Sequence, residues 1–122
     1  MDLQDKVVSI HPYYKVDDED VEACKQLADD LIETTRGEMG CLYYGFSFAK
    51  GEIHCREGYK NAETLLAHLD NVADLLQRLN SVAILFRLEI HGPSQELAKL
   101  QEFEPMKKLN PKYFILEGGF RN

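Results

Sequence analysis

The order in which the hydrophobic periodicity changes along the chain is the feature that most restricts its fold. Residues 6–11 (KVVSIH) predict a short strand that Pro12 ends. A helix is predicted next, from apolar or small side chains that recur every three or four positions. These residues are Val21, Cys24, Ala28, Leu31 and Thr35. Asp17 is expected to cap the start of this helix, and Arg36 and Gly37 mark its end.

A hairpin and a second helix follow. Residues 41–48 and 52–59 are rich in aromatic and β-branched side chains, and a three-residue connection that ends in glycine separates them. Asn61 is expected to cap the second helix, and a break is predicted near Asp70 and Asn71, where a fresh cap follows. The apolar stripe of this helix comprises Leu65, Leu69, Val72, Leu76 and Leu79.

Residues 82–91 predict a fourth strand, which completes the order β-α-β-β-α-β. That order is typical of the ferredoxin-like α+β fold. We therefore expect a single domain over residues 1–122, with a core at about 6–91 and an extension at 92–122. In the extension Ser94 is expected to cap a further helix, and residues 113–117 predict a fifth strand. This strand could pair with the sheet edge of a neighbouring subunit.

The apolar character of the strands implies a partner for the sheet. Both helices of this topology lie on one face, so the other face should be polar at alternate positions in a monomer. Residues 41–48 are apolar or aromatic on both faces. Strict alternation in residues 82–91 places Ile84, Phe86 and Leu88 on one face and Leu85 and Arg87 on the other. We expect a homodimer that encloses the second face.

Charge and composition exclude several classes of protein. The 122 residues are 44% hydrophobic and 29% charged, as in globular domains, with a net charge of −7. Eight acids and one base lie between Asp17 and Glu33, forming either a solvated helix face or an acidic docking surface. The chain has no basic stripe for nucleic acid, no apolar run that could span a membrane and no signal-peptide pattern. A cytoplasmic protein is expected.

The cysteine and histidine spacings do not predict a metal or a cofactor. Three widely spaced cysteines include no CxxC pair, and four histidines show neither HxH nor HExxH spacing. No flavin motif occurs. We therefore expect no metal ion and no cofactor.

Three ionisable residues are candidates for catalysis. His68 flanks the apolar stripe of the second helix, as either a hydrogen-bonded core histidine or a general base. Arg87 and His11 are predicted to share the second sheet face. There, either Arg87 holds a substrate anion while His11 takes a proton, or both belong to a salt-bridge cluster between subunits. Glu57 lies mid-strand and is expected to pair with Arg56 or Arg87.

Two segments resemble the antibiotic biosynthesis monooxygenase family, whose members are dimeric α+β barrels built from ferredoxin-like halves. These segments are residues 38–44 (EMGCLYY) and 56–69 (REGYKNAETLLAHL). The matching positions are Glu38, Gly40, Cys41, Tyr44, Glu57, Tyr59 and His68. Tyr59 stands where the family usually has tryptophan. Residues 75–79 lack the histidine that binds haem iron in the haem-degrading members, which argues against haem degradation.

The resemblance implies a cofactor-independent monooxygenase that acts on a phenolic, quinol or polyketide-like aromatic substrate. A base, His68 or His11, would deprotonate this substrate, and the anion would pass an electron to O2. Arg87 would stabilise the anion, with Tyr43, Tyr59 and Glu57 in contact with the ligand. The alternative is a non-catalytic dimeric barrel that binds a ligand or docks a partner. A closed pocket of roughly 300 Å3 or more would favour the enzyme or the ligand-binding form.

Overall fold

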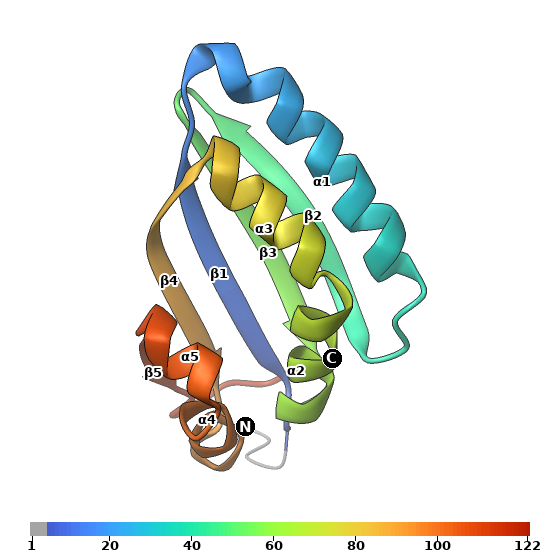
Figure 1. Ribbon diagram of the computed structural model, residues 1–122. Coiled ribbons are helices and arrows are strands. Elements are labelled where there is room, and N and C mark those ends of the chain that lie inside the picture. Colours follow the sequence, from blue (N-terminus) through green and yellow to red (C-terminus); the bar gives the residue numbers. More distant parts are fainter. Residues whose placement is uncertain (1–4) are drawn as a thin grey trace.

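The computed structural model describes residues 5–122 and has the predicted α+β fold (Figure 1). Its elements are β1 (Val8–Lys15), the short 3-10 helix η1 (Asp18–Asp20), α1 (Val21–Arg36), β2 (Cys41–Ala49), β3 (Glu52–Tyr59), α2 (Ala62–Asn71), α3 (Ala73–Val82), β4 (Ile84–Gly92), α4 (Ser94–Gln101), α5 (Glu104–Leu109) and β5 (Lys112–Ile115). Residues 1–4 lie outside the described range, and they belong to the N-terminal segment in which the sequence shows no signal-peptide pattern. None of the helices in residues 5–122 has both the length and the apolar character needed to cross a bilayer.

The five strands form one mixed sheet in the order β2-β3-β1-β4-β5. The first four strands are antiparallel to their neighbours, which confirms the ferredoxin-like arrangement. β5 runs parallel to β4 and extends the sheet at that edge, with Ile90 opposite Tyr113. The fifth strand therefore pairs with β4 of its own chain and forms one edge of the sheet, and its pairing with a neighbouring subunit stays a prediction.

β1 does not end at Pro12 but continues to Lys15. Proline lacks the N–H that a strand donates to its neighbour, so a central strand normally excludes it. Here the pairing with β3 passes from Ile10 opposite Glu57 directly to Tyr13 opposite His54, without a pair at Pro12. The Nδ1–H of His54 donates to the Pro12 carbonyl at 2.9 Å. The prediction of a strand end was wrong, because Pro12 keeps its pairing with Leu88 of β4 while its carbonyl accepts a hydrogen bond from a β3 side chain.

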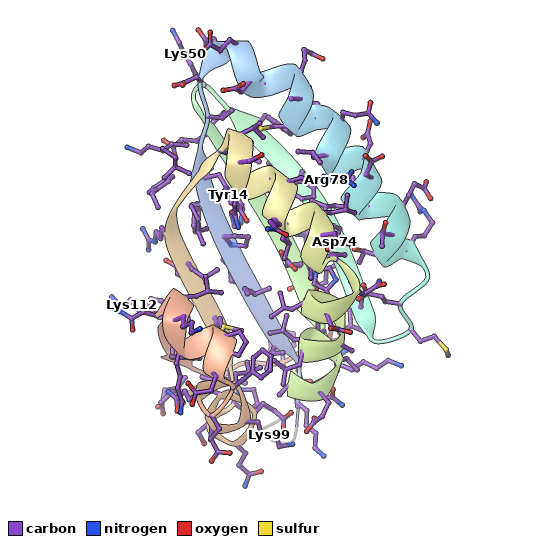
Figure 2. The ribbon with its side chains drawn as sticks, in the orientation of Figure 1. Tyr14, Lys50, Asp74, Arg78, Lys99 and Lys112 are labelled. Carbon is purple, nitrogen blue, oxygen red and sulfur yellow. The ribbon has the colours of Figure 1, made fainter. Side chains whose placement is uncertain are left out.

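All the helices pack on one face of the sheet (Figure 1). The α1 stripe predicted from the sequence is confirmed, since Cys24, Ala28, Leu31 and Thr35 are buried. Figure 2 shows Tyr14 among the side chains that fill the layer between the sheet and the helices, where it is buried near α3.

The caps of the helices follow the sequence only in part. Asn61 caps α2 through the Thr64 backbone N–H, as predicted. Asp17 makes no capping bond, and neither does Ser94, which lies inside α4. The predicted break after α2 is present, but Val72 occupies the cap position of α3 instead of Asn71.

A β-bulge changes which side chains of β4 share a face. Tyr13 lies opposite Arg87 and Tyr14 opposite Leu85, so one extra residue is inserted in β4. Leu85 therefore packs in the core with Tyr14, whereas the ring of Phe86 contacts Tyr13 on the other face. The strict alternation predicted for residues 82–91 was wrong at this point, because an inserted residue reverses the face of every later side chain.

No helix of residues 5–122 covers the second face of the sheet, which we call the open face (Figure 1). It carries histidines, aromatic rings and charged groups side by side. Its members include Ser9, His11, Tyr13, Lys15, Tyr43, His54, Arg56, Phe86, Arg87, Glu89, His91 and Phe114.

Candidate functional site

β3 directs a row of polar side chains into the layer between the sheet and the helices. Alternation along a strand sends Cys55, Glu57 and Tyr59 to the helix side, and all three are buried. Only 5% of Glu57 and none of Tyr59 is exposed. A carboxyl group in such surroundings is costly unless it is hydrogen-bonded or protonated.

Glu57 has a hydrogen-bond donor and a basic group beside it. The Tyr59 hydroxyl donates to Glu57 Oε1 at 2.6 Å, and His68 Nε2 lies 3.5 Å from the same oxygen. Burial raises the pKa of Glu57 to about 7, against the lowering effect of hydrogen bonds from Tyr59 and Cys55, while the Glu38 charge raises it further. Glu57 therefore exchanges a proton near neutral pH, as a general acid or base must.

His68 is held from its other side by Glu38. His68 Nδ1 lies 2.9 Å from Oε2 and 3.1 Å from Oε1 of that residue. The Asn71 amide donates to Glu38 Oε2 at 2.8 Å. His68 is 1% exposed, so it is buried and does not face water, as its position beside the apolar stripe predicted. Burial lowers its pKa below the ordinary histidine value, and Glu38 opposes that shift. The ring is neutral at pH 7.

Two tyrosines enclose the acid–histidine group. The rings of Tyr44 and Tyr59 lie 5.2 and 5.0 Å from the His68 ring, measured between centroids. Burial and then the Glu57 charge raise the pKa of both hydroxyls. Both phenols therefore keep their protons at neutral pH. We call Glu38, Tyr44, Glu57, Tyr59 and His68 the acid–base cluster.

A hollow of about 230 Å3 opens beside the cluster, between α1 and β2. Its lining includes Tyr44 and Cys41, with Arg36 as its basic residue. Thr35 also lines it, and the buried Thr35 Oγ1 has no hydrogen-bond partner among the described residues. The volume of this hollow is below the roughly 300 Å3 expected of an enzyme or ligand-binding pocket. A substrate could therefore enter only if side chains moved.

The predicted site residues fall into two groups on opposite faces of the sheet. His68, Glu57 and Tyr59 belong to the acid–base cluster, whereas His11, Arg87 and Tyr43 lie on the open face. The sheet separates the two groups, so one pocket within a chain cannot use both.

The open-face residues have partners of their own. Arg87 pairs with Glu89, and Arg56 stacks on the Tyr43 ring, 4.8 Å from its centroid. The pairing expected between Glu57 and an arginine was wrong, because Glu57 faces the helices while Arg56 and Arg87 face away from them. Burial, together with the charges of His91 and His54, lowers the pKa of His11 to about 4, which makes it a weak base.

Glu38 and Asn71 were not predicted as site residues. Glu38 belongs to the family pattern in residues 38–44, and that pattern was the available signal for it. Asn71 was interpreted only as a helix cap. Neither its spacing from His68 nor its residue type indicates that its side chain reaches back to Glu38.

A cluster of three carboxylates at the surface has the geometry to hold a cation. Asp17, Glu19 and Asp20 bring one ligand atom each to within 4.8 Å of one another at the start of α1. Asp17 and Glu19 are exposed and Asp20 is partly exposed, as in many acidic clusters that hold no ion, and the sequence predicted no metal there.

Comparison with known proteins identifies the relatives of this chain. MupZ from Pseudomonas fluorescens has 39% sequence identity and a TM-score of 0.91, over 98% of this chain and 91% of that one. A conserved protein from Methanosarcina mazei shares the fold with 21% identity, a TM-score of 0.66 and 72% and 93% coverage of the two chains.

An antibiotic biosynthesis monooxygenase is also similar in fold, with 18% identity, a TM-score of 0.59 and 68% and 92% coverage. No protein-family model and no curated protein sequence matches the chain. The predicted resemblance is therefore confirmed in the fold.

Proposed function

We propose that the acid–base cluster catalyses proton transfer on a small organic substrate. The premise is that the chain belongs to the same family as MupZ and has the fold of the antibiotic biosynthesis monooxygenases. The observation that carries the proposal is Glu57, buried, bonded to Tyr59 and titrating near neutral pH. Perturbed carboxyl groups of this kind concentrate at functional sites.

The fold favours an oxygen-using reaction as the specific form of this chemistry. Glu57 would take the proton of a phenolic, quinol or polyketide-like aromatic substrate, and the resulting anion would reduce O2. For a phenol with a free ring position, one oxygen atom forms a carbonyl at that carbon, the other leaves as water, and the two substrate hydrogens go to the water. Among the residues predicted from the sequence, Glu57 replaces His68 and His11 as the base, because its pKa is about 7 and it lies opposite Tyr44, which lines the hollow.

Oxygen consumption with a panel of hydroquinones, phenols and polycyclic phenols tests this form. We expect uptake by the native protein and a 10²- to 10⁴-fold lower rate for Glu57→Gln, which keeps the shape and removes the titrating group. Glu63→Gln is the matched control, since Glu63 is an exposed glutamate of α2 and should retain the full rate. An unchanged rate for Glu57→Gln would refute Glu57 as the base.

Failure of every substrate in that panel would refute the oxygen-using form. The alternative is then a non-catalytic barrel that docks a partner. The exposed acids of α1, which include Glu22, Asp29 and Glu33, favour this alternative because they outnumber the basic residues of that helix.

We infer also that a second copy of the chain covers the open face. This face combines aromatic rings with charges of both signs, because Arg87 and Arg56 lie on it together with Glu89. A twofold axis brings a surface against itself, so a face that carries both signs can complement its own copy. Aromatic and arginine side chains are also the types enriched at interfaces.

A further inference from the structure

Glu57 is isolated from solvent, although its proposed role requires it to exchange protons. The Tyr59 hydroxyl covers Oε1, and the surrounding side chains leave 5% of the residue exposed. His68 is the basic group next to Glu57, and Glu38 lies on the far side of His68. Glu38 is half-buried and hydrogen-bonded to the exposed Asn71, so this end of the row reaches the surface.

The bonds of Glu38 determine which nitrogen of His68 carries the proton. An ionised carboxylate only accepts hydrogen bonds, so a neutral His68 must place its proton on Nδ1 to bond with Glu38 at 2.9 Å. Its Nε2 then presents a lone pair toward Glu57 Oε1, 3.5 Å away. A short movement of either side chain closes that gap to hydrogen-bonding distance.

We propose that Glu38, His68 and Glu57 form a proton relay that connects the buried carboxyl group with solvent. The inference rests on the proposed role of Glu57 as the acid–base group. Glu38 orients His68 and carries the proton to solvent, whereas Asn71 is a positioning residue, because it acts on the relay through its hydrogen bond to Glu38.

The transfer is balanced at each atom. Protonated Glu57 passes its proton to His68 Nε2, His68 Nδ1–H passes its proton to Glu38, and Glu38 releases one proton to water. Glu57 ends with a charge of −1, Glu38 returns to its original charge, and the ring now holds its proton on Nε2. In that tautomer the Nδ1 lone pair faces the Glu38 carboxylate, which is unfavourable. Glu57 therefore tends to recover its proton by the reverse sequence.

The groups around His68 leave Glu38 as the route to solvent. Tyr44 from β2 and Tyr59 from β3 keep their protons at neutral pH. Burial raises the pKa of the Cys55 and Cys41 thiols, to about 11 for Cys41, so neither thiol exchanges a proton near pH 7. Within the described part of the chain, Glu38 is thus the carboxylate that joins His68 to the surface.

Nitrogen NMR of the histidine rings tests the relay without any substrate. Protein labelled with 15N in its imidazole groups should show neutral His68 as the Nδ1–H tautomer while Glu57 is protonated, and a growing Nε2–H population as Glu57 ionises near pH 7. A His68→Asn sample assigns the signal among the four histidines. A dominant Nε2–H tautomer while Glu57 is still protonated would overturn the proposal, whatever the behaviour of any variant.

Glu38→Gln provides the second measurement. Loss of the negative charge should lower the titration midpoint of Glu57, because a nearby like charge no longer opposes ionisation. It should also give a mixture of His68 tautomers, since a glutamine amide can donate to Nδ1 as well as accept from it. Glu22→Gln, the same change at an exposed position of α1, should leave both readouts unchanged. A Glu38→Gln protein with native tautomer and midpoint would refute the relay.

The two proposals fail separately. Absence of turnover with every substrate would refute the proposed function and leave the NMR result standing. A native-like Glu38→Gln spectrum together with a slow Glu57→Gln enzyme would refute the relay and leave the proposed function intact.

Discussion

Burial of Glu57 links the stability of the fold to pH. In the folded protein the pKa is about 7, against an ordinary value of 4.5, so the folded state binds more protons between these values than the unfolded state does. The contribution of a protonated Glu57 is fully present below pH 4.5 and is lost as the pH rises through 7.

The first prediction concerns the removal of this titration. We expect Glu57→Gln to gain stability relative to the native protein as the pH is raised from 5 to 8, by up to about 3 kcal/mol in the free energy of unfolding. Glutamine can still accept the Tyr59 hydrogen bond and carries no charge. Urea unfolding at pH 5 and pH 8 measures the difference, with Glu63→Gln as the control. Parallel pH profiles for the native protein and Glu57→Gln would show that Glu57 titrates normally.

His68 provides the second prediction. His68→Ala should lower the free energy of unfolding by about 1–3 kcal/mol, because it leaves a cavity and removes the ring partner of Glu38. Turnover per folded molecule should also fall if the ring serves Glu57. Melting temperature and specific activity from one preparation separate these effects. A variant that melts early and works at the native rate would restrict His68 to a structural role.

At the scale of elements, the connection between α1 and β2 positions Glu38 through a contact with α2. A Cβ atom at Gly40 would lie 2.4 Å from the Thr64 Cβ and Cγ2 atoms. Thr64 is also the residue that completes the capping box of α2, through bonds with Asn61 in both directions. Close packing at Gly40 therefore joins the loop that carries Glu38 to the start of the helix that carries His68.

The third prediction uses two glycines of this loop. Gly40→Ala should destabilise the protein by about 1–3 kcal/mol, because Thr64 must move and the α2 cap is disturbed. Gly37→Ala is the matched control: nothing lies within 4 Å of its added Cβ atom, and its backbone is in the right-handed helical region. Its stability should stay within about 0.5 kcal/mol of the native value or rise slightly. Equal melting temperatures for both variants would contradict the contact.

At the scale of the whole molecule, the open face makes the oligomeric state the main prediction. Sedimentation at micromolar concentration should give about 28 kDa, twice the 14.0 kDa of one chain, since twofold dimers are the commonest soluble oligomers. Tyr13→Glu should produce a folded monomer, because it places a charge between His54, Phe86 and Arg87 on that face.

Leu109→Glu is the control for this fourth prediction, since Leu109 is exposed at the end of α5 on the helix side of the sheet. It should remain a dimer. A native protein that sediments as a stable monomer would contradict the inferred role of the open face.

Local features of the fold could be predicted from the sequence because neighbouring residues determine them. The helical stripe of α1 and the cap at Asn61 depend on spacing and on side chains within one turn, and both are confirmed. The order of strands and helices follows from the same periodicities, and that order is sufficient to indicate the ferredoxin-like sheet.

Only the tertiary structure decided which residues meet. β1 continues through Pro12, which pairs with Leu88 of β4 and whose carbonyl accepts a bond from His54, 42 residues away. The β4 bulge reverses a face that simple alternation assigns wrongly. Glu38 and His68 are 30 residues apart and meet through the packing of a loop against α2. The pKa of Glu57 likewise depends on how completely the helices cover β3. Pairing register and desolvation arise from contacts distant in sequence, so spacing alone does not determine them.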